Sequence, residues 1–414
     1  MIIIMENIIF TAIIIILVAD FFFDRVMDYL NASRWSNVLP GELSGIYDSD
    51  KYRKSQDYSR INMKLGIITS TLSLLLIVGM LVFGGFGYLD AYVAQKTSHP
   101  VLAALLFFGI LGLASDVLAT PFDLYDTFVV EERFGFNRTT LRTYITDKLK
   151  GWLIALILGG GLLAVFVWFY SVAGSLFWLY AWLFFTAFSV FMSMFYSTLI
   201  VPLFNKQTPL PEGELRLAIE AFSARVGFKL DNIYVIDGSR RSTKANAYFS
   251  GLGPKKRVVL FDTLIKDHTV DELVAVLAHE IGHYKKKHTL QGMLISAVHA
   301  GFMLFLLGWF INRPELSLAL GAERPSFHMG ILAFGLLYAP VSLLLGILGN
   351  QISRHHEYEA DAFAARQFSP EPLKEALKKL SVNNLSNLRP HPAYVYVHYS
   401  HPPLLKRLSH LDKL

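Results

Sequence analysis

The chain has 414 residues, of which 53% are hydrophobic and 17% are charged, and its mean hydropathy is +0.41. A composition this apolar excludes an ordinary soluble globular protein and leaves room for several membrane spans plus one modest domain outside the membrane. The net charge of +5 does not indicate a nucleic-acid partner, because the basic residues gather beside hydrophobic stretches, where they set membrane topology. No cysteine is present, so disulfides and thiolate ligands are excluded and any transition-metal site must use His and carboxylate side chains.

Residues 1–205 are predicted to hold five membrane-spanning helices and the loops that join them. A span needs about 20 apolar residues in a helix, because lipid offers no hydrogen-bond partner to an open backbone. The predicted spans are residues 7–23, residues 65–89, a stretch from 97 past Ser115, and two helices within 152–205 that turn near Gly174 and Ser175. The first span lacks the basic start and the cleavage site of a signal peptide, so we expect it to remain in the protein.

The second half of the chain contains a small α+β insertion, two further spans and a C-terminal segment. The insertion covers residues 206–288, with helical periodicity at 209–226, short strands at 232–236, 247–250 and 257–261, and a helix at 270–288. A turn that contains Gly251, Gly253 and Pro254 is predicted between the last two strands. Spans at 289–311 and 328–349, within the segment 289–350, bring the expected total to seven, and residues 351–414 follow them.

The basic residues predict the orientation, since Lys and Arg in short loops stay on the cytoplasmic side of a membrane. They crowd the first loop, from Arg25 to Lys64, and the third loop, from Arg133 to Lys150, whereas the second loop contains Lys96 alone. The N-terminus is therefore expected outside. The α+β insertion and the C-terminal segment are expected in the cytoplasm.

Two carboxylates, Asp116 and Asp123, interrupt the end of the third predicted span. A charge inside lipid is costly, so Asp116 is expected to face an aqueous interior between the helices. Asp123 lies either there or at the headgroup boundary, and the sequence leaves both alternatives open.

The motif His279-Glu280-Ile281-Gly282-His283 carries the strongest chemical signal in the sequence. Histidines four residues apart project from one face of a helix, so both imidazoles can bind one Zn²⁺ ion. Zinc lowers the pKa of its bound water to about 7, and a neighbouring carboxylate can take that proton and deliver it to a leaving amine. The motif therefore predicts a zinc peptidase with Glu280 as general base. The alternative is a transporter or channel with a structural metal, although such a site needs no base beside its ligands.

A catalytic zinc site needs a third protein ligand, and the best candidate lies beyond the last predicted span. Glu357 and Asp361 are four residues apart and share a helix face, which suits one ligand and one carboxylate that orients a zinc-bound histidine. His355 and His356 are rival ligands, and His355 has Glu359 four residues further on. Spacing alone does not exclude that alternative pair.

Taken together, these motifs resemble the integral-membrane zinc metallopeptidases of the CAAX prenyl protease family. The HEIGH motif is followed by two hydrophobic spans and then by the ExxAD pattern of residues 357–361. The segments PFDLYDTFVVEERFGFN (121–137), NAYFSG (246–251) and YSHPPLLKRL (399–408) also resemble family segments. The related heat-shock membrane proteases share HExxH but are shorter and have fewer spans, so the CAAX protease branch is favoured over essentially the whole chain.

The resemblance implies a mainly α polytopic membrane protein, in which seven helices form a barrel around a large water-filled chamber. It implies one zinc ion per chain near the cytoplasmic mouth, with ligands at His279, His283 and Glu357, and Glu280 as general base.

By the same resemblance, Asn246, Ala247 and Tyr248 match an edge strand that pairs with an extended substrate through main-chain hydrogen bonds. His401 and Arg407 match donors that stabilise the oxyanion of the tetrahedral intermediate. Ordinary polarity at a membrane interface is the alternative explanation for those two residues.

Family members in eukaryotes remove the last three residues of prenylated CAAX proteins. Because the chain has no long extension after the seventh span and no KDEL-like ending, we expect a bacterial inner-membrane protein rather than one of the endoplasmic reticulum. Its substrates are then expected to be peptides or membrane proteins under processing or quality control, with prenylated proteins as a further class. We expect a monomer in the lipid bilayer.

Overall fold

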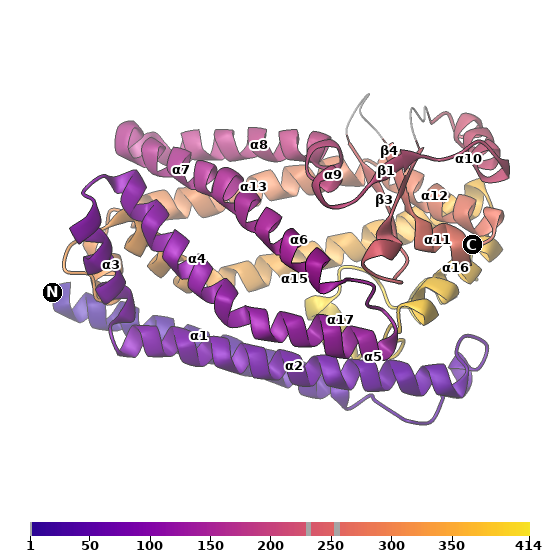
Figure 1. The fold of residues 1–414 in the computed structure, drawn as a ribbon, viewed down its shortest axis with the longest axis horizontal. Coiled ribbons are helices and arrows are strands. Elements are labelled where there is room, and N and C mark those ends of the chain that lie inside the picture. The colour runs from indigo at the N-terminus through magenta and orange to yellow at the C-terminus, as the bar shows by residue number, and fades with distance from the viewer. Residues whose placement is uncertain (1, 229–232, 252–256) are drawn as a thin grey trace.

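The computed structural model describes residues 2–228, 233–251 and 257–414, and most of these residues are helical. Long helices run along the longest axis of the molecule, and a small sheet lies towards the end that also carries the C-terminus (Figure 1). The helices of the first half are α1 (Ile2–Ala32), α2 (Ser49–Val82), α3 (Gly85–Lys96), α4 (Pro100–Tyr125), α5 (Glu132–Phe134), α6 (Leu141–Ile154), α7 (Gly160–Ala173), α8 (Phe177–Leu199) and α9 (Val201–Phe204). Those of the second half are α10 (Glu214–Arg225), α11 (Asp262–Asp267), α12 (Val270–Lys285), α13 (His288–Phe310), α14 (Pro314–Ala319), α15 (Phe327–Gln367), α16 (Pro370–Asn383), α17 (Pro392–His398) and α18 (Leu404–Leu411).

Six helical stretches of the described residues are long and apolar enough to cross a membrane, where seven spans were predicted. They are Ile4–Ala32, Ser49–Val82, Pro100–Phe134, Leu141–Phe204, His288–Phe310 and Phe327–Gln367. The difference lies in Leu141–Phe204, which forms one stretch of 64 residues although the chain reverses within it. A short turn at Gly174–Leu176 separates α7 from α8, which run back along each other (Figure 1), so the predicted turn is confirmed.

The end predicted for the second span, at residue 89, is wrong, and its helix begins well before residue 65. Its helix, α2, stops at Val82 because Gly84 adopts a left-handed conformation (φ +67°), which glycine reaches without a steric cost. At its start, α2 reaches back to Ser49, where the Asp48 side chain caps it by accepting a hydrogen bond from the Lys51 amide. The basic residues from Lys51 to Lys64, which were assigned to a loop, therefore lie on the first turns of a 34-residue helix.

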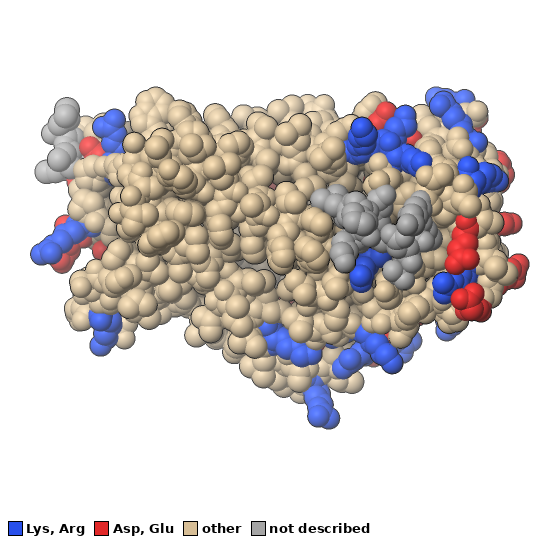
Figure 2. All heavy atoms as spheres, turned by 90° about the horizontal axis from the view of Figure 1, so that it is seen from above, with Lys and Arg blue, Asp and Glu red and all other residues tan. Residues whose placement is uncertain are grey.

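Charged side chains avoid the middle of the helical region. Figure 2 shows charged side chains at the left end and over the right half and lower centre of the face in view, with an uncharged band between the two groups. This is the distribution expected of a polytopic membrane protein, because charges are costly in hydrocarbon and favoured at its borders.

A four-stranded sheet forms the centre of the α+β insertion. Its strands are β1 (Gln207–Pro209), β2 (Ile233–Ile236), β3 (Ala247–Ser250) and β4 (Arg257–Phe261), in the order β1-β2-β4-β3. Strands β2 and β4 are parallel, and the two outer strands pair antiparallel to them, so β3 lies at an edge. The first residue of the predicted strand 232–236 and the predicted turn residues Gly253 and Pro254 lie outside the described residues.

Helix α12 is the centre of the insertion's core and carries the HEIGH motif. Thr269 and Glu272 form a reciprocal capping box at its start, and the Glu272 carboxylate also contacts Lys379 Nζ at 2.7 Å. The helix buries Leu273, Leu277 and Ile281 against the sheet, α10 and α16. This burial fixes the rotation of α12, so its two histidines point to the opposite side.

Helix α15 is a single helix of 41 residues, where a span at 328–349 and a separate segment after it were predicted. No Gly or Pro occurs between Gly349 and the helix end at Gln367, so no residue breaks the helix there. Glu357 is consequently carried by the same rigid element as the last span.

Candidate active site

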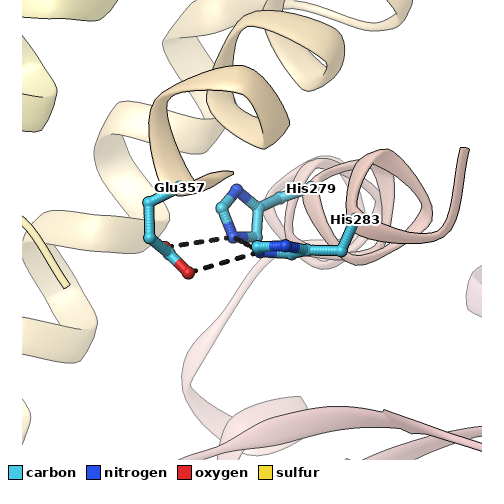
Figure 3. Close-up of side chains that lie close together, drawn as sticks. All are labelled: His279, His283 and Glu357. Carbon is cyan, nitrogen blue, oxygen red and sulfur yellow. Dashed lines mark hydrogen bonds and ion pairs between the residues drawn. The ribbon is translucent and has the colours of Figure 1, made fainter. Parts of the chain in front are cut away.

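Three side chains from two helices converge near the C-terminal end of α12. His279 and His283 project from α12 towards Glu357 of α15 (Figure 3). The two imidazole Nε2 atoms lie 3.1 Å apart, and the Glu357 carboxylate oxygens lie 3.4 Å from His279 Nε2 and 3.3 Å from His283 Nε2. All three ligand atoms lie within 4.8 Å of one another. Among the described residues, these three side chains form the group that could hold a metal ion.

The close approach of α12 and α15 depends on Gly282, which lies between the two histidines. A Cβ at this position would lie only 3.1 Å from both the Cα and the carbonyl oxygen of Ala360. Any larger residue would therefore push the backbone of α15 away. The glycine of the motif thus brings Glu357 within reach of the imidazoles.

The donor set fits a zinc ion. Two imidazoles and one carboxylate are a ligand set typical of catalytic zinc. His279 is 7% exposed and Glu357 is 4% exposed, and Glu357 Oε2 is buried without a hydrogen-bond partner. Buried polar atoms normally form hydrogen bonds, so a buried carboxylate oxygen that forms none and lies 3.4 Å from His279 Nε2 is a position at which a cation is expected.

Asp361 and Arg407 form a second layer behind His279. Asp361 Oδ1 lies 2.8 Å from His279 Nδ1, and Arg407 donates to both oxygens of this fully buried carboxylate, from Nε at 2.8 Å and from Nη2 at 2.5 Å. A third guanidinium nitrogen, Nη1, lies 3.3 Å from Glu357 Oε2. Burial disfavours a charged imidazole, but hydrogen bonds to Asp361 and Glu357 outweigh it and raise the pKa of His279 to about 9. The pocket therefore attracts positive charge.

A second chain of contacts lies behind His283. His283 Nδ1 lies 3.0 Å from His288 Nδ1, and His288 Nε2 lies 2.9 Å from Glu359 Oε2. An ionised carboxylate only accepts hydrogen bonds, so His288 carries its proton on Nε2 and accepts from His283 with Nδ1. His283 then keeps Nε2 free to bind a metal, which is the tautomer that the site needs.

His288 was not identified from the sequence, because it was assigned to the same helix as the motif. The structure ends α12 at Lys285, and Lys287 adopts a left-handed conformation (φ 61°) before α13 begins. This turn brings His288 back against His283. On an uninterrupted helix, residues five apart point in different directions, so the spacing contained no signal for this pair.

His401 approaches the site from the segment between α17 and α18. Its Nε2 lies 3.3 Å from Glu357 Oε1, yet 64% of its side chain is exposed, so it faces open space beside the cluster.

Arg354 and Asn350 of α15 hold the end of α17 in place by hydrogen bonds to its backbone carbonyls. Arg354 Nη1 lies 3.0 Å from Val395 O, and Asn350 Nδ2 lies 2.7 Å from Val397 O. Neither residue was singled out from the sequence, since their function depends on a contact with a distant segment.

Glu280 lies on the open side of the cluster. It lines a cavity of ≈ 420 Å³ together with His283, His288, Phe249 and Thr289. Burial raises the pKa of the Glu280 carboxyl, and the two neighbouring imidazoles oppose this shift. A raised carboxyl pKa brings the group closer to the value that suits a general base.

The predicted substrate strand is β3, at the open edge of the sheet. The Phe261 amide donates to the Asn246 carbonyl oxygen, and Ala247 pairs with Leu260. Because such pairs alternate along an antiparallel ladder, Ala247 and Phe249 turn their backbone groups away from β4. The Tyr248 hydroxyl lies 3.5 Å from Ser197 Oγ of α8. The Asn246 side-chain oxygen accepts a hydrogen bond from the Ala247 amide at 2.8 Å.

The rival ligands and the two carboxylates of the third span lie apart from the cluster. The His355 side chain is 73% exposed and, among the described residues, forms an ion pair with Glu359 alone, at 4.0 Å. His356 stacks on His288 with ring centroids 4.0 Å apart. Asp116 accepts from Trp152 Nε1 at 3.0 Å and lies 3.1 Å from Lys148 Nζ. Asp123 lies 3.8 Å from the same amine, so α6 supplies the partner of both carboxylates.

Comparisons with known proteins place the chain in a family. Residues 28–206 match the family described as CAAX prenyl protease N-terminal, five membrane helices, and residues 209–414 match peptidase family M48. The chain belongs to peptidase family M48. Within the family it is similar to CAAX prenyl protease 1 of Saccharomyces cerevisiae, with 34% identity over 95% of this chain and 93% of the relative.

Other relatives agree with this assignment. The CAAX prenyl protease 1 homolog of Homo sapiens is 32% identical over 91% of this chain and 89% of its own. The crystal structure of S. mikatae Ste24p has a TM-score of 0.92 and 32% identity, and the match covers 98% of this chain and 99% of that one. The protein is thus a multi-pass membrane metallopeptidase of the CAAX prenyl protease type, which favours the enzyme over the transporter or channel. The family implies a metal, and the cluster of His279, His283 and Glu357 fits one.

Proposed function

We propose that this membrane metallopeptidase hydrolyses peptide bonds with one zinc ion held by His279, His283 and Glu357, and with Glu280 as general base. The convergence of three ligand atoms within 4.8 Å carries the proposal. The described residues offer three ligands rather than the four of a closed structural site, which leaves one coordination position for water or substrate. The partners behind both imidazoles support it, because they fix the tautomers that bind metal.

A zinc ion held there would supply Lewis acidity that polarises the scissile carbonyl and increases the acidity of water. Glu280 accepts a proton from the attacking water and delivers it to the nitrogen of the leaving amine. His401 is the proposed donor to the developing oxyanion, because its exposed ring stands beside Glu357. Arg407 was predicted to share this task, but two of its nitrogens are already bonded to Asp361. We therefore assign it a positioning role for Asp361 and Glu357.

The edge strand β3 is proposed to bind the substrate backbone. Edge strands bind extended peptides by main-chain hydrogen bonds, and the outward carbonyl of Ala247 and the outward backbone groups of Phe249 supply them here. The Asn246 side chain fixes the start of this strand through the Ala247 amide. Asn246→Ala is expected to weaken peptide turnover without a loss of bound zinc, measured by steady-state kinetics and metal content. Unchanged kinetics would remove Asn246 from the site.

The membrane context is part of the proposal. We propose that the long helices form a seven-span barrel around a water-filled chamber, with the site at the cytoplasmic end and the N-terminus outside. The names of the relatives, CAAX prenyl protease 1 and its homologs, support prenylated proteins as one substrate class. Processing or quality control of other membrane proteins, a bacterial inner-membrane location and a monomeric state remain predictions.

The test is digestion of plain and farnesylated peptides of one sequence by the purified protein, with and without a zinc chelator, and with products identified by mass. We expect cleavage that the chelator abolishes and added zinc restores. Glu280→Gln should keep zinc and lose activity by a factor of about 10² to 10⁴. Asp271→Asn is the matched control, because Asp271 is exposed at the start of the same helix. Full hydrolysis by Glu280→Gln would refute the mechanism.

A further inference from the structure

The family segment at residues 121–137 has no place in the mechanism so far. Between α4 and α5 it forms a π-helical stretch, Asp126–Glu131. A π-helix is rare and is frequently found at functional sites, and its hydrogen bonds span one residue more than those of an α-helix. The side chains that follow are therefore rotated relative to α4. The last residue of the stretch, Glu131, contacts Lys244 of the α+β insertion, which lies 113 residues further along the chain.

Lys244 is held by a carboxylate and a hydroxyl from two different elements. Its Nζ lies 2.9 Å from Glu131 Oε2 and donates to the Tyr58 hydroxyl of α2 at 2.9 Å, and that hydroxyl donates in turn to Glu131 Oε1. The buried rings of Phe134 and Phe136 pack edge-on against Tyr58, with centroids 5.0 and 5.3 Å away. Because the Glu131 side chain is only 17% exposed, salt screens this ion pair less than a pair on the open surface. We call Tyr58, Glu131 and Lys244 the Lys244 clamp.

The family segment also pairs with the chain just before Lys244 through its main chain. The Thr243 amide donates to the Phe136 carbonyl oxygen at 3.0 Å. Beside this hydrogen bond, Asn137 and Ser242 form an isolated antiparallel β-bridge. The contact between the family segment and the insertion is therefore continuous rather than a single ion pair.

The residues around Lys244 are held by further elements outside the sheet. Arg241 forms a bidentate ion pair with Asp147 of α6, at 2.7 and 2.9 Å. The Ala245 amide donates to the side-chain oxygen of Asn384, which follows α16, at 3.3 Å. The chain is thus fixed at successive points by groups that belong to α2, α6, the family segment and the end of α16.

These contacts end where the proposed substrate strand begins. Strand β3 starts at Ala247, and it is paired with β4 on one side and open on the other. A shift of its register by one residue would turn the main-chain groups of Tyr248 outward in place of those of Ala247 and Phe249, because alternate residues face opposite sides. Lys244 lies three residues before the strand, so a fixed Lys244 opposes such a shift.

We propose that Lys244, held by Glu131 and Tyr58, is a positioning residue that fixes the register of β3 for an extended peptide. This rests on the proposed function of β3 as the substrate strand. It assigns to the family segment the task of aligning the substrate strand with the membrane spans. A residue that only stabilises the fold would change the amount of folded protein, whereas a residue that fixes register also determines which substrate amides are bound.

The test measures peptide binding to the zinc-loaded Glu280→Gln protein, which serves as the reference. A labelled peptide is compared with analogues that each replace one amide by an ester, which removes one main-chain donor. In the reference protein, affinity should fall at every second position, because alternate main-chain groups of a strand face its partner. Lys244→Met in the same background is expected to raise the Kd of the unmodified peptide about tenfold and to remove this alternation.

Three further variants separate register from stability. Lys244→Arg is expected to keep both affinity and alternation, because a guanidinium also binds the Glu131 carboxylate. Lys378→Met is the matched control, since Lys378 forms its ion pair with Glu375 within α16, at 2.7 Å. Glu131→Gln should weaken binding, and its combination with Lys244→Met should bind no more weakly than Lys244→Met alone, because both changes remove one contact.

Alternation in Lys244→Met that matches the reference would overturn the proposal even where affinity falls, because a loss of stability leaves the register intact. Additive effects of the two changes would overturn it as well. If Lys244→Met does not fold, Tyr58→Phe decides the question, since it removes a single hydroxyl: weaker alternation supports the clamp, and unchanged affinity and alternation refute it. Absence of alternation in the reference protein removes β3 from the proposed function, and the clamp with it. Absence of chelator-sensitive cleavage by the parent counts against the peptidase itself.

Discussion

Replacement of His288 tests whether the chain of contacts behind His283 controls the metal. In His288→Ala, the His283 imidazole loses its partner at 3.0 Å, and Glu359 is no longer connected to His283 through the His288 ring. The removed link is a hydrogen bond polarised by a carboxylate, and partners of this kind typically contribute tenfold to a hundredfold to zinc affinity. This corresponds to about 1.4 to 2.7 kcal/mol.

The assay is competition between the purified protein and a chelator of known zinc affinity, so the measurement does not depend on hydrolysis. His288→Asn is expected to recover part of the loss, because its side-chain oxygen can accept from His283. His355→Ala is the control, since this exposed residue reaches only Glu359 and also represents the rival ligand. Equal zinc affinity in His288→Ala and the parent would refute the positioning role. A large loss in His355→Ala would show that the ligand set is wrong.

Three further predictions concern the helix contact, the buried ion pair and the topology. Gly282→Ala is expected to lower zinc affinity in the same assay, because its Cβ would clash with the backbone of Ala360; unchanged affinity would refute the contact. Arg407→Met is expected to destabilise the protein by about 3–5 kcal/mol, since a buried carboxylate loses its partner, and thermal unfolding in detergent that matches the parent would contradict this. Glu323→Cys, exposed between α14 and α15 in a chain without cysteine, should react with an impermeant thiol reagent from outside the membrane. Reaction from the cytoplasmic side alone would reverse the proposed orientation. Ser326 is less suitable for this label, because its hydroxyl donates to Asp90.

The convergence of His279, His283 and Glu357 could be predicted because helical periodicity is local. Spacing of four residues fixes the direction of the two imidazoles, whatever the rest of the fold. Glu357 was harder, since its position depends on the close approach of α12 and α15 at Gly282. Its selection over His355 and His356 rested on metal-ligand chemistry and on the family resemblance.

Other features depend on backbone conformations that sequence patterns do not encode. The left-handed residue Lys287 brings His288 to His283, although a lysine is an uncommon choice for that conformation. Similarly, the break at Gly84 shortens the second span, although hydropathy stays high across it. Hydropathy measures whether a segment tolerates lipid, and it contains no information on where a helix turns.

The continuity of α15 explains how one chain joins the membrane spans to the candidate metal site. At its start, His328 lies 2.6 Å from Asp90 of α3 and its ring packs on Phe107 of α4, so the helix is anchored among the spans. At its other end the same helix provides Glu357 and Asp361, which contact the histidines of α12. The insertion is thus joined to the spans through the residues proposed to bind zinc. Because α15 also lines the ≈ 420 Å³ cavity that holds Glu280, Glu357 and this cavity are positioned by one rigid element.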